Sequence, residues 1–305
     1  MPPAPRKPLD AFAASTMLLL CAIWGAQQVA IKLAAADVVP TIQVTVRSGM
    51  SALLVAALEA WRGGRLPLRA RNLRPGLLAG ALFGVEFLLI GEGLRNTSAS
   101  HMVVFLYTAP VFTAVGLHLL VPAERLRPHQ WLGVAVSFGG IALAFLGGTA
   151  PGAAGVAGLR GDVCAVLAGA AWGATTIVIR TSSLSEAPAT ETLLYQLAGG
   201  FAFLVVATLA LGSGPAVATP VSVASLLFQG VVVSFASYLT WFWLLRRYLA
   251  TRLSVFSFMT PIFGVAFGVL VLGDPVTPAF AAGAALVLAG ITIVSGAGLA
   301  RRGAA

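Results

Sequence analysis

Two short stretches of this sequence place aromatic and polar side chains on one helical face within apolar runs. Trp24, Gln27 and Gln28 stand at positions i, i+3 and i+4, and Trp172 and Thr176 repeat the i and i+4 positions 148 residues later. Such a face could bind a small amphipathic solute, with indole rings as walls and amide or hydroxyl groups as hydrogen-bond partners. The alternative is hydrogen bonding between packed helices, and the sequence leaves both interpretations open.

Glu86 is, by sequence, the only acidic residue deep within an apolar run. A charge at the centre of a bilayer costs at least about 2.5 kcal/mol, so we expect this carboxyl group to be protonated, paired or in contact with water. It could bind an ammonium group or a coupling proton. The alternative is a structural pair with Arg47, which lies within another apolar run.

Further ring-bearing residues with polar tips lie inside apolar runs: His101, Tyr107, Tyr238 and Trp241. Aromatic ligands stack well on such rings, so these residues join the candidate substrate-binding set. The two cysteines and the histidines do not follow a metal-binding spacing. We therefore expect neither a metal nor a cofactor.

The composition around these candidates is strongly apolar. Residues of the AVILMFWYC set make up 58% of the 305 residues, charged residues make up 10%, and the mean hydropathy is +0.93. Soluble domains are about 25% charged, so this composition predicts a protein embedded in a lipid bilayer. The formal charge is +9, but the basic residues lie in short gaps between apolar runs. That distribution favours lipid headgroups and excludes a nucleic-acid-binding domain.

Pro, Gly and charged residues divide the chain into ten apolar runs, each near the ~20 residues that a membrane-crossing helix needs. The runs lack the period-two alternation of a transmembrane β-barrel. We therefore predict an all-α polytopic membrane protein with ten transmembrane helices, at residues 12–34, 39–62, 75–95, 98–121, 129–148, 160–180, 188–211, 221–246, 251–272 and 277–298.

Lysine and arginine residues predict the orientation of these spans. With the N-terminus in the cytoplasm, fifteen of the 19 basic residues lie on the cytoplasmic side, and Lys32, Arg95 and Arg160 lie outside; Arg47 lies within a span. The positive-inside rule favours this orientation. Both termini are then cytoplasmic, which requires an even number of spans.

The sequence repeats itself at an offset of 148 to 151 residues. Residues 22–32 read AIWGAQQVAIK and residues 170–180 read AAWGATTIVIR, with five of eleven positions identical. The sequence VFLYTAPVF around Pro110 matches VFSFMTPIF around Pro261. Matches at nearly constant spacing indicate that one ancestral unit is present twice.

The two predicted repeats, 1–150 and 151–305, each contain five helices. Because five is odd, the second repeat enters the membrane from the opposite side, which makes the pair an inverted repeat. Inverted repeats are typical of transporters that bind their substrate near the bilayer midplane, between the two halves. We therefore expect two domains with a shared central site.

These features carry a resemblance to a known family: the tryptophan–glycine pairs at Trp24 and Trp172, the prolines Pro110 and Pro261, and the acidic residues Glu124 and Asp274. The chain resembles the EamA-type members of the drug/metabolite transporter superfamily, and within it is most similar to the bacterial exporters of aromatic amino acids. The resemblance implies a transporter that exports aromatic amino acids or related small metabolites across the bacterial inner membrane.

Pro110 and Pro261 are expected near the centres of the fourth and ninth spans. A mid-helix proline lacks an amide donor and frees a carbonyl one turn earlier, here that of Leu106 or Ser257. We expect the resulting kinks to act as gating hinges. The alternative is a pair of static kinks that only help packing, since membrane helices tolerate proline well.

The remaining alternatives concern the function. The chain could export other metabolites or cationic drugs, or, in a different class, it could be an intramembrane enzyme or a receptor. The sequence has neither a P-loop nor an HExxH or GxSxG motif, which argues against ATP-driven transport and against these classes of hydrolase. We expect a monomeric transporter, not an enzyme, that acts on a small-molecule substrate.

Overall fold

The computed structural model describes residues 10–63, 69–122, 125–146, 156–212, 214–248, 257 and 259–300. These residues form helices and one isolated antiparallel bridge, between Val38 and Ala216. The helices are α1 Ala11–Leu33, α2 Pro40–Trp61, α3 Leu73–Leu94, α4 Ala99–Leu106, α5 Ala109–Leu120, α6 Pro128–Leu146, α7 Val156–Thr181, α8 Ala189–Leu211, α9 Pro220–Leu227, α10 Tyr238–Arg247, α12 Met259–Phe267 and α13 Pro278–Ala300. Two π-helical segments, η4 Phe228–Ser237 and η5 Gly268–Leu272, continue α9 and α12.

Lipid-facing character is evident along much of the bundle. Seven helical spans in the described residues are long and apolar enough to cross a membrane. Two of them combine elements: Ala99–Leu120 contains α4 and α5, and Pro220–Trp241 contains α9, η4 and the start of α10. Two shorter apolar spans cover Met259–Leu272 and Pro278–Ile293. Large apolar side chains such as Leu53, Leu119 and Leu209 are exposed on the outside, as expected where lipid replaces water. The prediction of an all-helical polytopic membrane protein is confirmed, and the number of ten spans stays a prediction.

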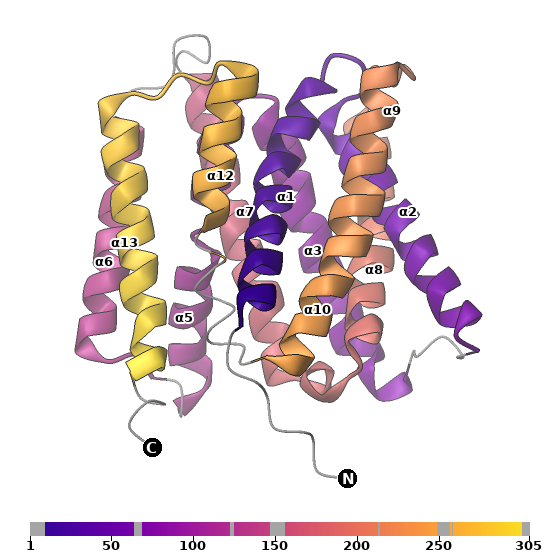
Figure 1. Ribbon diagram of the computed structural model, residues 1–305, viewed down its shortest axis with the longest axis horizontal. Helices are drawn as coiled ribbons and strands as arrows, with labels where there is room; N and C mark the ends of the chain where they lie inside the picture. The colour runs from indigo at the N-terminus through magenta and orange to yellow at the C-terminus, as the bar shows by residue number, and fades with distance from the viewer. Residues whose placement is uncertain are drawn as a thin grey trace.

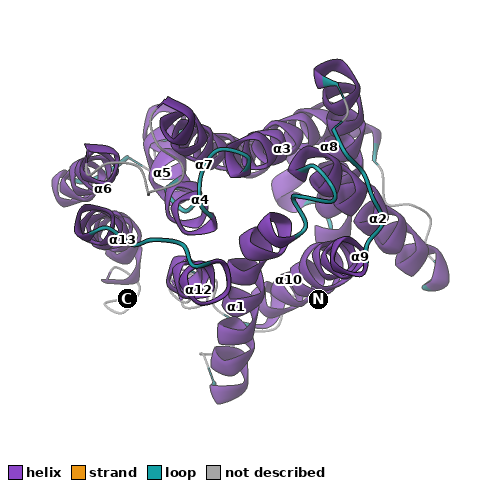
Figure 2. Cartoon of the chain, turned by 90° about the horizontal axis from the view of Figure 1, so that it is seen from above, coloured by secondary structure: helices purple, strands orange, loops and turns teal. Residues whose placement is uncertain are grey.

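The helices of the two sequence halves interdigitate. α1 begins and α13 ends at the same end of the bundle, which we call the terminal end; the opposite end is the far end (Figure 1). Seen from above, one row contains α7, α3 and α8, another contains α12, α1 and α10, and α6 packs against α13 at one edge (Figure 2). Each row therefore mixes helices from both halves.

The predicted span 98–121 is not one continuous helix. α4 ends before Tyr107, and α5 begins after Thr108. Pro110 lies in the first turn of α5, where a missing N–H costs no helical hydrogen bond. The Thr108 hydroxyl donates to the carbonyl of Phe105 at 2.6 Å and satisfies one acceptor at the end of α4. The proline therefore begins a helix at a break within the predicted span, and the role of Pro110 as a gating hinge stays a prediction.

Pro261 also lies in the first turn of its helix as described, because α12 begins at Met259. The carbonyl of Ser257, expected to lack a donor, accepts a hydrogen bond from the backbone N–H of Thr260 at 3.1 Å. Most of the beginning of the predicted span 251–272 lies outside the described residues. Within them, Pro261 is the third residue of α12, and the residue directly before Met259 lies outside the described part of the chain.

The glycines of the two tryptophan–glycine pairs make equivalent close contacts. A Cβ atom at Gly25 of α1 would lie 2.7 Å from the backbone nitrogen of Gly264 in α12, and 3.0 Å from the Cβ atom of the preceding phenylalanine. A Cβ atom at Gly173 of α7 would lie 3.1 Å from the backbone nitrogen of Thr113 in α5, and 2.9 Å from the Cβ atom of the preceding phenylalanine. Each glycine thus packs three residues beyond the proline of the other half.

Helices α6 and α13 cross through a second matched pair of glycines. A Cβ atom at Gly133 would lie 2.8 Å from the carbonyl oxygen of Gly290, and one at Gly140 would lie 2.6 Å from that of Gly283. Gly133 and Gly140 correspond to Gly283 and Gly290 at an offset of 150 residues. The correspondence therefore turns the Gly133–Gly290 contact into the Gly140–Gly283 contact and back again. A two-fold relation between the halves requires such an exchange. Small residues let the backbones approach closely, as at many membrane helix crossings.

Candidate functional site

Polar side chains from six segments meet inside the bundle. We call them the central polar cluster: Cys21, Arg47, Glu86, Tyr107, Tyr238 and Thr260. Electrostatic interactions connect Arg47 with Glu86 and Tyr238, and Tyr107 interacts in turn with Glu86 and Tyr238. All except Tyr238 are buried, and Tyr238 is partly buried. Such groups are costly in hydrocarbon, so their convergence indicates a functional site.

Glu86 and Arg47 face each other without forming an ion pair. The two groups interact electrostatically, but no guanidinium nitrogen of Arg47 bonds to the Glu86 carboxylate; the Tyr238 hydroxyl interacts with the guanidinium, and none of its nitrogens has a partner in full hydrogen-bond geometry among the described residues. The guanidinium instead lies over the ring of Phe87, 3.7 Å from its centroid. The structural salt bridge considered as the alternative role of Glu86 is therefore not formed.

Two aromatic pairs include members of the predicted site. Trp24 of α1 and Trp241 of α10 meet edge to face with their centroids 5.9 Å apart, and the Trp24 Nε1 donates to the Ser237 hydroxyl at 2.8 Å. Tyr107 and Trp172 make a similar pair at 5.2 Å. The indole rings of Trp24, Trp172 and Trp241 are all partly exposed. Each pair contains one residue from each half of the chain.

The amide and hydroxyl groups of the predicted faces have separate environments. Gln27 and Gln28 are buried, and the Gln28 Oε1 has no hydrogen-bond partner among the described residues. The Thr176 hydroxyl donates to the carbonyl of Trp172 in its own helix at 3.0 Å. The Thr176 hydroxyl therefore donates within its own helix. Among the described residues, Trp24 does make a hydrogen bond to another helical segment, from its Nε1 to the Ser237 hydroxyl.

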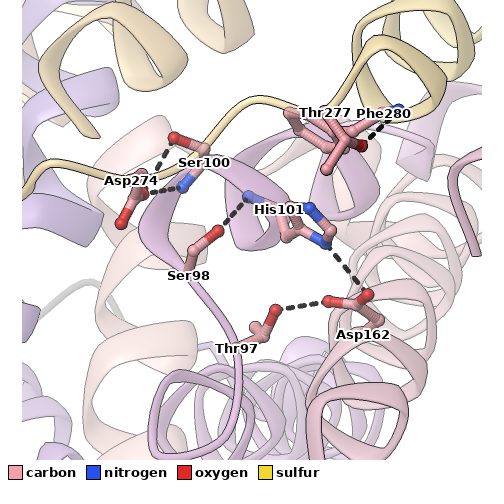
Figure 3. Close-up of polar contacts among 8 residues, drawn as sticks. All are labelled: Thr97, Ser98, Ser100, His101, Asp162, Asp274, Thr277 and Phe280. Atoms are coloured by element: carbon pink, nitrogen blue, oxygen red, sulfur yellow. Dashed lines mark hydrogen bonds and ion pairs between the residues drawn. The ribbon is translucent and has the colours of Figure 1, made fainter. Parts of the chain in front are cut away.

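His101 lies in a different cluster, at the far-end start of α4 (Figure 3). Its Nδ1 lies 2.9 Å from the Asp162 Oδ2 of α7, and the Asp162 Oδ1 accepts from the Thr97 hydroxyl. The imidazole ring stacks on Phe280 of α13 with centroids 4.1 Å apart. Six residues separate His101 from Tyr107, which is about 9 Å along a helix. The structure therefore places His101 apart from the central polar cluster, in a buried pair that joins α4 to α7.

Asp274 ties the loop before α13 to the same end of α4 (Figure 3). Its Oδ2 accepts from the backbone N–H of Ser100 at 2.9 Å and from the Ser100 hydroxyl at 2.8 Å. The carboxylate therefore satisfies two donors in the first turn of α4, where the helix dipole also favours a negative charge. Its sequence counterpart Glu124 lies outside the described residues.

Replacing Asp162 with alanine should destabilise the protein by about 3 kcal/mol. The change leaves the Thr97 hydroxyl and the His101 imidazole buried without their shared acceptor. The free energy of unfolding of the detergent-solubilised protein measures the effect. Glu186→Ala is the control, because Glu186 forms an exposed pair with Arg71 at 3.8 Å and such pairs contribute little. Equal stabilities of the two variants would contradict the structural role of the buried pair.

Sequence reasoning missed four buried polar residues: Asp162, Glu191, Gln43 and Gln229. Asp162 is 2% exposed and Glu191 is fully buried, so Glu86 is not the only acidic residue buried within a helix. The sequence does contain a signal for Asp162. It lies near the outer end of the predicted span 160–180, and His101 lies near the outer end of the predicted span 98–121, so the two side chains were expected at the same depth. Gln43 and Gln229, which share a 2.8 Å hydrogen bond, were visible as amides within apolar runs. Among the described residues, no group of three or more His, Cys, Asp and Glu residues could hold a metal ion.

Comparison with known proteins defines the family. The EamA-like transporter family matches this chain over residues 11–146 and again over residues 159–296. The chain belongs to the EamA-like transporter family.

Several relatives are named as transporters of bacteria and archaea. The uncharacterized transporter YoaV of Bacillus subtilis (strain 168) is 23% identical, over 88% of this chain and 91% of its own length. An uncharacterized transporter of Archaeoglobus fulgidus is 27% identical, over 92% and 96%. The uncharacterized inner membrane transporter YedA of Escherichia coli (strain K12) is 28% identical, over 55% and 49%. The protein is therefore a membrane transporter.

A solved crystal structure shares the fold. It superimposes with a TM-score of 0.65, covers 94% of this chain and 98% of its own, and is 19% identical in sequence. At this identity the likeness concerns the arrangement of helices, and the substrate has to be argued from the side chains of this chain.

Proposed function

We propose that the protein exports small amphipathic metabolites, with aromatic amino acids as the preferred class, by alternating access to a central site. The observation that carries the proposal is the central polar cluster flanked by the pairs Trp24–Trp241 and Tyr107–Trp172. Glu86 provides a group for an ammonium ion, and the rings provide stacking surfaces for an aromatic side chain. Both halves of the chain contribute residues, as a midplane site between repeats requires.

Two inverted five-helix repeats, 1–150 and 151–305, are part of the proposal. The family matches the chain twice, once in each half. The glycine contacts of α1 with α12 and of α7 with α5 correspond to each other, and so do the two glycine contacts between α6 and α13. These paired contacts support a two-fold relation in which the halves exchange conformations and expose the site to either side in turn.

The proposed orientation puts the terminal end in the cytoplasm of a bacterial cell and the chain in its inner membrane, as a monomer. The excess of basic residues in the predicted cytoplasmic segments supports it. Polar contacts then connect the outward-facing ends of several helices. Lys32 of α1 donates to the carbonyl of Leu94 of α3 at 2.6 Å, and Asp37 accepts from Thr219 at 2.5 Å. Release to the outside requires these contacts and those of His101 and Asp274 to separate.

Counterflow in proteoliposomes tests the proposed function. Purified protein is reconstituted, loaded with unlabelled phenylalanine, and supplied with labelled phenylalanine or tryptophan outside, with and without a pH gradient. We expect saturable accumulation of both amino acids and none of labelled glucose. Accumulation of neither amino acid, with intact reconstituted protein, would contradict the aromatic amino-acid assignment.

Replacing Pro110 or Pro261 with alanine should slow transport about tenfold without lowering expression. Alanine restores an amide donor and has a high helix propensity, so it favours extending α5 or α12 across the point where each begins. Initial rates of labelled phenylalanine exchange measure the effect. Pro128→Ala is the matched control, because Pro128 is exposed at the start of α6. Wild-type rates in both hinge variants would leave the prolines with a packing role only.

A further inference from the structure

Arg47 holds a positive charge inside the bundle that the described part of the chain does not fully satisfy. Its side chain is fully buried, and its Nε, Nη1 and Nη2 atoms have no hydrogen-bond partner among the described residues. An arginine side chain stays protonated in proteins. The cation–π contact with Phe87 at 3.7 Å replaces only part of the hydration that the charge loses on burial.

The neighbours of Arg47 satisfy its guanidinium only in part. Tyr238 interacts with it electrostatically and through its hydroxyl group, whereas Glu86 interacts only electrostatically, and none of the guanidinium nitrogens has a partner in full hydrogen-bond geometry among the described residues. Phe87 covers one face of the guanidinium plane and therefore leaves the N–H groups at its edge available. A buried cation with free N–H groups next to a substrate site is complementary to an anion.

We propose that Arg47 binds the carboxylate of the transported solute. A carboxylate matches the planar arrangement of guanidinium N–H groups and can accept two of their hydrogen bonds at once. The proposal rests on the proposed function and narrows it, because the substrate must then carry a carboxylate. Glu86, one position before Phe87 on α3, provides the opposite charge for the ammonium group. The central polar cluster thus recognises both charges of an amino acid.

Three probes distinguish the proposed role of Arg47 from that of Glu86. Phenylalanine carries both groups, phenylpyruvate carries the carboxylate without the ammonium group, and phenethylamine carries the ammonium group alone. Binding of each probe is measured in detergent from the rise in unfolding temperature, and transport is measured in proteoliposomes by competition with labelled phenylalanine. The variants are Arg47→Gln and Arg47→Lys, and Arg95→Gln is the control, because Arg95 is exposed and pairs with Glu92.

We expect Arg47→Gln to weaken the binding of phenylalanine and phenylpyruvate about 100-fold, the effect of losing a charge-assisted bidentate contact. Phenethylamine binding stays within about twofold, which also shows that the variant is folded. Arg47→Lys keeps the charge and loses the planar geometry, so its loss is about tenfold. Arg95→Gln behaves as the wild type.

Two results would overturn the inference: unchanged binding of phenylpyruvate and phenylalanine in Arg47→Gln, or equal weakening of all three probes in both Arg47 variants. The failure of the proposed function is a different result, in which the wild type exchanges no phenylalanine. Binding of phenylpyruvate to the detergent-solubilised wild type and its loss in Arg47→Gln would then still support a carboxylate site.

Discussion

The proposed export of aromatic amino acids should fall about 100-fold when Glu86 is replaced by glutamine. The amide has nearly the same shape as the carboxyl group, so the packing of α3 is kept while its ability to carry a negative charge is lost. Glu86 lies in the central polar cluster, 6% exposed and opposite Arg47. A buried charge-assisted contact to an ammonium group is stronger than a neutral hydrogen bond, and only the carboxylate can form it.

The measurement is the initial rate of phenylalanine counterflow as a function of pH. Glu92→Gln provides a control on the same helix, because Glu92 pairs with Arg95 at 3.1 Å near the surface, where such pairs contribute little. We expect the control to transport as the wild type does. A wild-type rate and an unchanged pH profile in Glu86→Gln would remove Glu86 from the transport site.

The second large effect is expected at the tryptophan–glycine pairs. Leucine at Gly25 or Gly173 should reduce transport more than tenfold and destabilise the protein by about 1–3 kcal/mol or more, because overpacking at a close crossing forces the backbones apart. The new Cβ atom would lie 2.7 Å from a backbone nitrogen at Gly25 and 3.1 Å from one at Gly173. Backbone atoms cannot move aside as a flexible side chain can.

Gly139→Leu is the matched control, since a Cβ atom at Gly139 would have nothing within 4 Å. Unfolding temperature and counterflow are measured for all three variants. If the two halves are equivalent, Gly25→Leu and Gly173→Leu fail together. Full activity of either variant would show that its crossing does not have to stay close during the transport cycle.

Much of the fold could be predicted because a bilayer restricts the choices. A spanning segment must satisfy its own backbone hydrogen bonds, so each long apolar run predicts a helix. The predicted spans 39–62 and 188–211 agree closely with α2 and α8. A kink at Pro110 was predicted, but not that the span divides there into α4 and α5, because a proline in the first turn of a helix and one within a helix look the same in sequence.

The sequence indicates candidate site residues by their type and does not indicate which residues they contact. Trp24 and Trp172 were identified from their repeated motif, but their partners Trp241 and Tyr107 depend on which helices pack together. His101 was grouped with the other rings, and its stacking on Phe280 and pairing with Asp162 depend on the position of α13 and α7. Hydropathy locates helices along the chain and does not specify their neighbours.

The contacts of Arg47 also could not be predicted from the sequence. Two opposite charges within spans suggest an ion pair, and the sequence left that alternative open for Glu86. In the structure the guanidinium lies on Phe87, one residue along α3 from the expected partner. Adjacent residues on a helix point about 100° apart. A shift of one position on α3 therefore decides whether Arg47 contacts the Glu86 carboxylate or the Phe87 ring.

Labelling from the two sides of the membrane tests the inverted repeat most directly. Ala36 and Ser185 are exposed in the loops that follow the first helix of each half. A membrane-impermeant maleimide is added to spheroplasts that express Ala36→Cys or Ser185→Cys, with the unmodified chain as the control for Cys21 and Cys164. We expect Ala36→Cys to be labelled at once and Ser185→Cys only after the membrane is permeabilised. Labelling of both variants from the same side would contradict two halves of opposite orientation, and with them the alternating site between the halves.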